Sequence, residues 1–248
     1  MKNICAIIFA AGKGSRMNNS SPKVLLKLAD QPIIFWILRT LKNTGINQVV
    51  TIIGYQSKLV KETILKEGFV SKFVEQKELL GTANSLQVSF NKVPKDCTTL
   101  LVLFGDDSAF YKPETIKDFI NYHIQNKNKG TFLTSYLDEP NPIGGLNLDS
   151  GGHVLGVMRQ SEIVKSKLKK YPILCGAFCF DKDWIMKNIS KIEKSDLSGE
   201  YPLPSIYKVA LDNGEYIDTF CIKNKDEWVS INTPEELEIA NLKKVGIK

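Results

Sequence analysis

Three continuous apolar runs stand out in the first half of the chain. They are residues 4–10 (ICAIIFA), 48–54 (QVVTIIG) and 99–104 (TLLVLF), and a glycine lies at or just beyond the end of each. Strands that are buried on both faces of a sheet have this composition, whereas half-exposed strands alternate apolar and polar residues. We therefore predict three buried strands at these positions.

Between the strands, apolar residues recur with the spacing of an amphipathic helix. The predicted helices span residues 32–43, 55–67 and 113–126. Pro32 stands first in the first helix, where proline is favoured because its missing N–H would have no partner. One face of the third helix is expected to carry Ile116, Phe119, Ile120 and Ile124. Alternating strands and helices indicate β-α-β units and a mostly parallel sheet flanked by helices.

The second half of the chain is less regular. Residues 130–136 and 173–180 are strand-like, and a glycine-rich segment lies between them. A C-terminal helix is predicted over 234–244, with Thr233 as its N-cap. No repeat or low-complexity linker divides the chain, so we predict one α/β domain over residues 1–248. Its expected parts are 1–125, then 126–230, which supplies an insertion and a lid, and finally the helix within 231–248.

Composition narrows the class of protein. Hydrophobic residues make up 43% of the 248 residues and charged residues 24%, which excludes a disordered, collagen-like or coiled-coil chain. Lysine and arginine number 33 against 27 acids, so the net charge is +6. This excess is typical of a protein with an anionic ligand and equally of a solvated surface. It is too diffuse to predict nucleic-acid binding.

The cysteines and the N-terminus bear on the compartment. The five cysteines are odd in number and form no C-x-x-C pair, so we predict neither a disulfide framework nor a zinc site. A reducing cytoplasm is the simplest compartment for such a chain. Cys175 and Cys179 lie in an apolar run and are expected to act as small core residues. The apolar run at the N-terminus ends at Ala11, too short to span a bilayer, and we expect no membrane association.

A glycine loop follows the first predicted strand, with the sequence AAGKGSRMNNSSPK. Gly12 and Gly14 would let backbone N–H groups approach phosphate oxygens, and Arg16 and Lys23 would add positive charge for a triphosphate. The loop is neither a Walker A motif nor a G-x-G-x-x-G fingerprint, because Met17 stands where the last glycine belongs. Taken alone, it is also typical of a turn with surface cations.

The full string AAGKGSRM, a short spacer, SPKVLLKL and a following Pro-Ile resembles the signature of the sugar-nucleotide pyrophosphorylases, in particular their N-acetylglucosamine-1-phosphate uridylyltransferase domain. The resemblance implies a Rossmann-like nucleotidyltransferase fold with a nucleotide-binding first half and an acceptor-binding second half. It also implies that Arg16 and Lys23 are catalytic, hold the triphosphate and offset charge at the α-phosphorus. The nucleotide-binding loop would comprise Ala10, Ala11, Gly12 and Gly14.

A second segment, QKELLGTA (76–83), resembles the part of the family that contacts the pyrimidine. The resemblance implies that Gln76 bonds to the base edge and that the backbone of Gly81 and Thr82 completes a flat slot. The same residues are typical of a helix start, with Thr82 as N-cap of residues 83–90, and both interpretations can hold together. Because an amide can serve either base, UTP and CTP both remain open.

Two further segments resemble those that hold Mg²⁺ in the family. In LFGDD, Asp106 matches the metal-ligating aspartate, while Asp107 is expected only to add negative field. In SINTPEEL, Asn232 matches the second ligand in one alignment, whereas a W-x-D-x-G-T-P alignment fits Trp228 and places Ser230 there. We prefer Asn232, because an amide carbonyl is a hard oxygen ligand, the kind that Mg²⁺ takes. A solvent-exposed turn and a loop before a capped helix are the structural alternatives.

The acceptor side matches less well. GEY (199–201) resembles a family segment on that side and suggests Glu200, and Gly145 matches a glycine near the acceptor. However, Arg159 stands near an expected glutamate and Leu174 near an expected asparagine. Both changes remove hydrogen-bond acceptors, which argues against N-acetylglucosamine 1-phosphate. Arg159 suggests an acceptor with extra negative charge or is simply a surface residue.

The sequence therefore predicts a Mg²⁺-dependent nucleotidyltransferase of cell-surface polysaccharide biosynthesis. It would transfer a nucleotidyl group from a pyrimidine nucleoside triphosphate to a phosphorylated small acceptor and release pyrophosphate. Three alternatives stay open: a cytidylyltransferase for a non-sugar acceptor such as phosphoglutamine in capsule modification, a GT-A-like glycosyltransferase, and a non-catalytic nucleotide-binding regulator. The oligomeric state and the acceptor are left undetermined.

Overall fold

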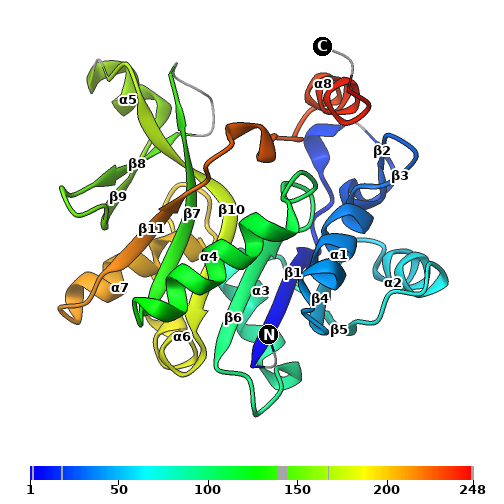
Figure 1. Cartoon of the computed structure of the whole chain (residues 1–248), viewed down its shortest axis with the longest axis horizontal. Coiled ribbons are helices and arrows are strands. Elements are labelled where there is room, and N and C mark those ends of the chain that lie inside the picture. The colour runs from blue at the N-terminus through cyan, green and yellow to red at the C-terminus, as the bar shows by residue number, and fades with distance from the viewer. Residues whose placement is uncertain (2, 18, 139–143, 167, 247–248) are drawn as a thin grey trace.

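A seven-stranded sheet forms the centre of the structure, a computed structural model that describes residues 1, 3–17, 19–138, 144–166 and 168–246. Its strands are β1 (Ile4–Ala10), β4 (Gln48–Ile53), β5 (Lys72–Glu75), β6 (Thr99–Phe104), β7 (Gly130–Leu137), β10 (Tyr171–Asp181) and β11 (Ile217–Cys221). Their order is β11-β7-β10-β6-β1-β4-β5, as Figure 1 shows. β10 runs antiparallel to both of its neighbours, and the other pairs are parallel. The predicted mostly parallel α/β fold is confirmed.

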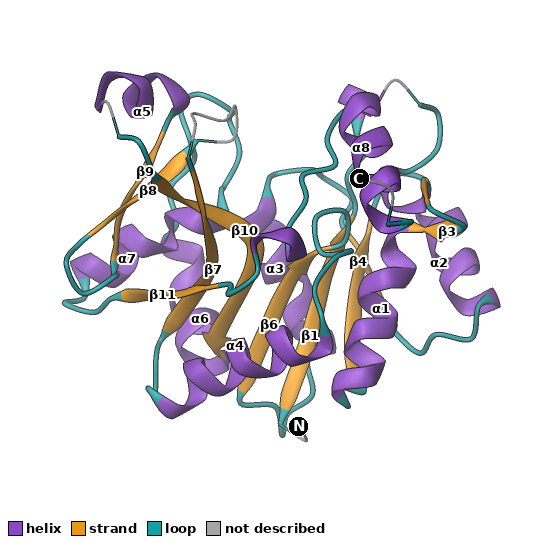
Figure 2. Cartoon of the chain, turned by 45° about the horizontal axis from the view of Figure 1, so that its top comes forward, coloured by secondary structure: helices purple, strands orange, loops and turns teal. Residues whose placement is uncertain are grey.

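Helices cover both faces of this sheet (Figures 1 and 2). One face packs against α1 (Ile33–Thr44), α2 (Ser57–Lys66) and α4 (Pro113–Gln125), and the other against α3 (Thr82–Ser89), α6 (Lys182–Asn188) and α7 (Ile206–Asp212). All seven residues of β1 are buried, and they alternate between the two cores: Ile8 faces α1, whereas Ile7 faces the opposite side. This two-sided burial explains why the strand is a continuous apolar run.

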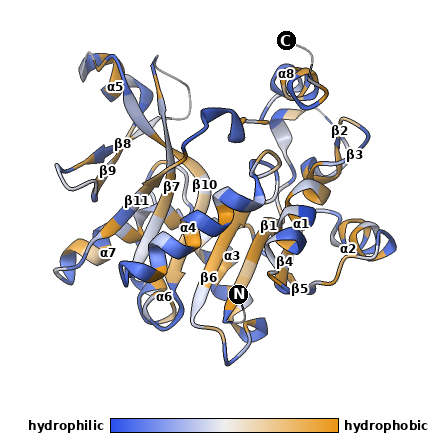
Figure 3. Cartoon of the chain, in the orientation of Figure 1, coloured by the Kyte–Doolittle hydropathy of each residue, from blue (hydrophilic) through white to orange (hydrophobic). Residues whose placement is uncertain are grey.

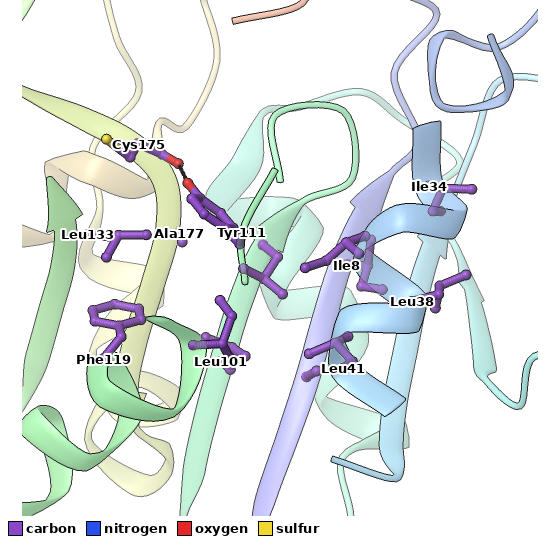
Figure 4. Close-up of a cluster of buried hydrophobic side chains, with 14 of the residues drawn as sticks. Ile8, Ile34, Leu38, Leu41, Leu101, Tyr111, Phe119, Leu133, Cys175 and Ala177 are labelled. Carbon is purple, nitrogen blue, oxygen red and sulfur yellow. Dashed lines mark hydrogen bonds between the residues drawn. The ribbon is translucent and has the colours of Figure 1, made fainter. Parts of the chain in front are cut away.

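The core on the α1 side joins strands and helices from distant parts of the sequence (Figure 4). Ile8 and Leu101 from the sheet meet Leu38 and Phe119 from the helices, and all four are at most 3% exposed. Burying each such side chain stabilises the fold by about 1.5–3 kcal/mol. The hydroxyl of Tyr111, in the segment between β6 and α4, donates to the backbone carbonyl of Cys175 in β10, which Figure 4 draws as a dashed line.

The central strands are largely apolar, whereas the outer faces of the helices are largely polar (Figure 3). The predicted helix 32–43 begins one residue later, because Pro32 has an extended backbone (ψ 139°) and serves as the N-cap. In α4, Ile116, Phe119 and Ile120 are buried as predicted, but Ile124 is 48% exposed. A helix turns about 100° per residue, so position 123 faces the core more squarely than position 124.

The second half contains elements that the sequence pattern did not reveal. A separate hairpin of β8 (Gly145–Leu148) and β9 (Val154–Met158) occupies the predicted glycine-rich segment, followed by α5 (Gln160–Ser166). β5, β11, α6 and α7 were also unpredicted, because four to seven residues are too few to show a periodicity. The remaining elements are β2 (Lys27–Leu28), β3 (Gln31–Pro32) and α8 (Pro234–Lys244). Thr233 caps α8 as predicted, since its hydroxyl accepts from the N–H of Glu236 at 3.2 Å.

Two of the cysteines take the core positions predicted for them. All five are free thiols, and Cys175 and Cys179 are fully buried in the core. Burial raises the pKa of the Cys5 thiol to about 12. Among the described helices, none has both the length and the apolar character to cross a membrane.

His123 takes the inward position on α4, and its burial predicts that the fold is sensitive to acid. It is 2% exposed, its Nδ1 lies 2.9 Å from Thr131 Oγ1, and burial lowers its pKa to about 4 despite the opposing effect of two aspartates. The unfolded chain binds a proton below about pH 6.5, whereas the folded chain resists it until about pH 4. We therefore expect the free energy of unfolding to decrease as the pH is lowered from about 6.5 to about 4.

Replacing His123 with Gln should lower stability at neutral pH but remove this part of the acid dependence, which can reach on the order of 3 kcal/mol. Denaturant unfolding of both proteins at a series of pH values measures the difference. Equal slopes of unfolding free energy against pH in the two proteins would contradict the assignment.

Candidate active site

Two adjoining cavities lie beyond the carboxyl ends of the parallel strands. The first, of about 360 Å³, is lined by residues that end or follow β1, β5 and β6, and the second, of about 340 Å³, lies toward β8 and β10. Arg16, Phe104 and Asn232 line both. Ligands of open α/β sheets bind at this edge, so the position is that of a functional site.

The glycine loop after β1 forms one wall of the first cavity. Gly14 has a positive φ of 69°, and an added Cβ would lie 2.7 Å from the Cβ of Lys23. The missing side chain therefore allows the stem of Lys23 to lie against the loop. At Gly12, in contrast, no described atom lies within 4 Å of an added Cβ. The fold needs glycine at position 14, and position 12 only faces the open cavity.

Lys23 joins three segments that are far apart in the sequence. Its Nζ lies 2.5 Å from Asp106 Oδ2 and donates to Asn232 Oδ1 at 2.9 Å. Arg16 Nη2 donates to the same Asn232 oxygen at 3.0 Å. Lys23 is only 6% exposed, and a buried ammonium group needs such partners to offset its loss of water. The three predicted site residues Lys23, Asp106 and Asn232 thus meet at one point.

The orientation of Asn232 is fixed by the start of α8. Its Nδ2 donates to Ser230 Oγ at 2.6 Å, and its backbone N–H donates to Glu236 Oε2 at 2.5 Å. Ser230 Oγ in turn donates to the same Glu236 oxygen at 3.1 Å. The amide oxygen of Asn232 consequently faces the cavity, whereas Ser230 supports it from behind, and this geometry favours Asn232 over Ser230 as a metal ligand.

Glu236 was not singled out in the sequence, although a signal for it existed. Threonine followed three residues later by glutamate is the spacing of a capping box, in which the glutamate bonds back to the N-cap N–H. Here Thr233 is the N-cap, but Glu236 bonds one residue further back, to Asn232. The local pattern therefore predicts where the helix starts, but it does not reveal that Glu236 orients Asn232 in the site.

The donor groups at this point suit a divalent metal ion. The oxygens of Asp106 and Asn232 both contact the same Lys23 nitrogen, so they converge on a space of cation size. Carboxylate and amide oxygens are hard ligands, and Mg²⁺ is commonly held by one or two protein oxygens together with phosphate and water. Within the described residues there is no cluster of three or more His, Cys, Asp or Glu side chains, a set that such Mg²⁺ binding does not require.

Asp107 lies beside Asp106 but lines the second cavity instead of the first. Burial raises the pKa of its carboxyl group to about 7, the negative charge of Asp106 adds to the rise, and Lys23 opposes it. Its backbone neighbour at position 106 is paired with Lys23, whereas Asp107 is not in that ion pair. The two adjacent aspartates therefore belong to different parts of the site.

Gln76 follows β5 and lines the first cavity, and its side-chain amide is hydrogen-bonded to neighbouring side chains. Its Nε2 donates to Asn84 Oδ1 at 2.9 Å, and its Oε1 accepts from Ser85 Oγ at 2.6 Å. These partners fix the amide at the cavity wall. Asn84 and Ser85 were not singled out from the sequence, since a polar residue inside a short helix carries no local signal of its partner.

The segments LLGTA and GEY are packed against each other. Gly81 has a φ of 103°, and an added Cβ would lie 2.7 Å from the backbone nitrogen of Tyr201. Tyr201 in turn donates to the Leu80 carbonyl at 2.8 Å. This contact places Glu200 in the first cavity with the residues expected to contact the nucleotide. The predicted capping role of Thr82 is wrong: Gly81 is the N-cap, and Thr82 Oγ1 instead accepts from the N–H of Leu203 at 2.8 Å.

The residues expected to contact the acceptor divide between the cavities and the surface. Gly145 lines the second cavity, as does Leu174. Arg159 is exposed and lines neither cavity. Its backbone N–H donates to Glu162 Oε2 at 2.6 Å, and its backbone carbonyl accepts from the N–H groups of Glu162 and Ile163. The structure therefore brings together all the predicted site residues except Arg159. This arginine lies on the surface, as the alternative interpretation of its role predicted.

Comparisons with known proteins agree with this geometry. A family model described as nucleotidyl transferase matches residues 5–244. The bifunctional protein GlmU of Bacillus cereus strain AH187 is 28% identical over 242 residues, which cover 98% of this chain and 52% of that protein. GlmU of Bacillus anthracis strain CDC 684 matches with the same identity and coverage. The chain spans about half the length of these curated relatives.

A solved structure shares the fold. It is assigned as a glucose-1-phosphate thymidylyltransferase from Bacillus anthracis, in complex with a sucrose. The TM-score is 0.79 at 21% identity, and the match covers 99% of this chain and 96% of that one. At this identity the likeness establishes the arrangement of the sheet and helices, not the ligand.

The two glycines of the loop provide a matched test of its construction. Gly14→Ala should lower the free energy of unfolding by about 1–2 kcal/mol, because it places a side chain at positive φ against Lys23. Gly12→Ala makes the same chemical change in open space and should leave the stability nearly unchanged. Thermal and denaturant unfolding of the two variants checks this, and equal stability losses would contradict the described packing.

Proposed function

Because the chain belongs to the nucleotidyl transferase family, we propose that it is a Mg²⁺-dependent nucleotidyltransferase of the sugar-phosphate type. It transfers a nucleotidyl group from UTP or CTP to a phosphorylated small acceptor, as a cytoplasmic enzyme of cell-surface polysaccharide biosynthesis. The observation that carries the proposal is the meeting of Lys23, Asp106 and Asn232 at the junction of two cavities. The first cavity takes the nucleotide and the second the acceptor.

The reaction needs alignment and charge stabilisation more than acid–base chemistry. An oxygen of the acceptor phosphate forms a bond to the α-phosphorus, the bond between the α-phosphorus and the bridging oxygen breaks, and pyrophosphate leaves. The acceptor phosphate is already anionic, so no side chain has to remove a proton. Arg16 lines both cavities and can contact phosphates on either side of the forming bond. Positioning and fixed positive charge account for the rate enhancement.

Lys23 is held ready near the reacting phosphates by the residues that would bind the metal. Asp106 and Asn232 would hold Mg²⁺, and Lys23 would then be free to pair with the phosphate oxygens. Bound Mg²⁺ supplies neutralisation of the charge on those oxygens. The stem of Lys23 lies against Gly14, so its Nζ stays within the glycine loop in either arrangement.

The acceptor side of the proposal leaves room for a non-sugar molecule. Leu174 lines the second cavity near the place where the uridylyltransferases are expected to have an asparagine. An apolar side chain cannot bond to a sugar hydroxyl or acetamido group, which argues against N-acetylglucosamine 1-phosphate. A phosphorylated amino acid used by a capsule cytidylyltransferase is therefore kept beside the sugar 1-phosphates.

A pyrophosphate-release screen tests the proposal. UTP, CTP, dTTP and ATP are each combined with sugar 1-phosphates and phosphorylated amino acids in the presence of Mg²⁺. Pyrophosphate from a pyrimidine nucleotide supports the proposal. Release of a nucleoside diphosphate instead would indicate a glycosyltransferase, and tight nucleotide binding without turnover of any acceptor would indicate a regulator.

Lys23→Ala should lower turnover by about 10²–10³-fold, the effect of removing one preorganised donor from a phosphate in the transition state. The fold should remain intact, as circular dichroism and thermal unfolding can verify. Lys27→Ala, which removes the same charge from an exposed side chain in the same segment, serves as the control. Normal pyrophosphate release by the Lys23 variant would refute the catalytic role.

Removal of divalent metal with EDTA should abolish turnover, and added Mg²⁺ should restore it. Asp106→Asn removes the negative charge of the carboxylate, the single charged group of the two converging ligands, so the variant should need at least about tenfold more Mg²⁺ for half-maximal rate. Asp212→Asn, at an exposed position at the end of α7, is the matched control. An unchanged Mg²⁺ dependence of the Asp106 variant would exclude it as a ligand.

A further inference from the structure

Two of the described residues that line the second cavity carry buried polar atoms without a partner. Among the described residues, five buried side-chain nitrogen or oxygen atoms make no hydrogen bond: Gln31 Oε1, Gln48 Oε1, Asp107 Oδ1, Ser108 Oγ and Trp228 Nε1. Two of the five, on Asp107 and Trp228, belong to residues that line this one cavity. Leaving such a group unsatisfied costs about 1–3 kcal/mol, so each calls for an explanation.

The position of Asp107 is built into the fold. A register shift in β10 between Leu174 and Phe178 brings Gly176 opposite the aspartate. Gly176 has a φ of 68°, and an added Cβ would lie 3.3 Å from the Cβ of Asp107 and 2.9 Å from the ring of Phe104. A backbone hydrogen bond from Ile231 holds the carboxylate from the other side. Asp107 is thus part of the cavity wall and not a solvated turn residue.

The two unpartnered atoms define complementary demands on a ligand. Once it is ionised, as beside a bound cation, the carboxylate of Asp107 only accepts hydrogen bonds, and the indole N–H of Trp228 only donates them. Trp228 is 9% exposed, so water has little access to its N–H. A ligand that satisfies both must carry a donor group for Asp107 and an acceptor oxygen for Trp228.

The charges around the cavity favour a positively charged donor. Asp107 and Glu236 both line it, and Arg16 is the single cation among its described lining residues. Arg16 is bonded to Asn232 at the boundary with the first cavity, and Lys23, whose charge also acts on Asp107, is paired with Asp106. Among the described residues, neither cation forms an ion pair with Asp107. The rings of Trp228 and Phe104 also line the cavity, and aromatic faces attract an ammonium group.

Building on the proposed function, we infer that the second cavity selects an acceptor that carries a free amine. The ammonium group binds Asp107, an oxygen of the same molecule accepts from Trp228, and the phosphate lies toward Arg16. Two kinds of molecule share this chemistry: an amino sugar phosphate whose nitrogen is not acylated, and a phosphorylated amino acid. An N-acetylated sugar lacks the charge, because its nitrogen is an amide.

Matched acceptor pairs test the inference. Glucosamine 1-phosphate is compared with glucose 1-phosphate and N-acetylglucosamine 1-phosphate, and phosphoserine with its hydroxyl counterpart 3-phosphoglycerate. The wild-type protein should prefer the amine of a pair by at least about tenfold in kcat/KM. Preference within the first set identifies an amino sugar, and preference within the second identifies an amino acid.

Asp107→Asn keeps the shape of the side chain and removes its charge. It should raise KM for the amine acceptor at least about tenfold, with kcat nearly unchanged and nucleotide binding and Mg²⁺ dependence unaltered. For the hydroxyl acceptors, which bring no charge to Asp107, the rise in KM should be clearly smaller than for the amine acceptor. Trp228→Phe keeps an aromatic ring without the N–H and should also raise KM for the amine acceptor, and Asp212→Asn again serves as the exposed control.

A merely structural role for Asp107 would lower the rates with amine and hydroxyl acceptors alike, and this result would overturn the inference, as would the absence of any amine preference. Turnover of hydroxyl acceptors alone would leave the proposed function standing and refute the inference. If no acceptor is turned over, the proposed function fails. The inference about the amine is then tested by calorimetric binding of glucosamine 1-phosphate and phosphoserine. Binding weakened in the Asp107 variant then supports the inference, and no binding to the wild type overturns it.

Discussion

The pairing of the Lys23 ammonium group with Asp106 and Asn232 is the interaction on which the site depends. A buried cation without partners would cost several kcal/mol, so the three segments that contribute these residues must come together. They are the loop after β1, the turn after β6 and the segment before α8. The contact therefore joins the edge of the sheet to the segment before the last helix, at the boundary between the two cavities.

Neighbouring residues position Lys23 and Asn232 for this contact. Gly14 leaves space for the stem of Lys23, and Glu236 and Ser230 turn the amide oxygen of Asn232 toward it. In this arrangement the positive charges of Arg16 and Lys23 are gathered around one oxygen before any ligand arrives. A preorganised set of charges of this kind stabilises a reacting phosphate without reorganisation during the reaction.

The two cavities differ in how completely they are satisfied. In the first, the amide of Gln76 is bonded to Asn84 and Ser85, and Lys23 is paired. In the second, Asp107 and Trp228 retain unpartnered atoms among the described residues. Under the proposed assignment, the nucleotide side is thus largely complete by itself, whereas the acceptor side needs groups that the ligand must bring. This contrast parallels the sequence, in which the nucleotide motifs match the family and the acceptor segments depart from it.

The sequence by itself determined the parallel sheet and the site at its carboxyl edge, because apolar runs, helical spacing and a glycine loop are local patterns that follow directly from burial. The resemblance of its motifs to a known family also singled out Lys23, Asp106 and Asn232, which the structure brings together. Only the tertiary structure decided which of two adjacent aspartates faces which cavity. The neighbour of Asp107 is Gly176, on a strand distant in the sequence and bulged at that point, and no local pattern encodes such a contact. The surface position of Arg159 was decided in the same way, by the path of the chain into α5.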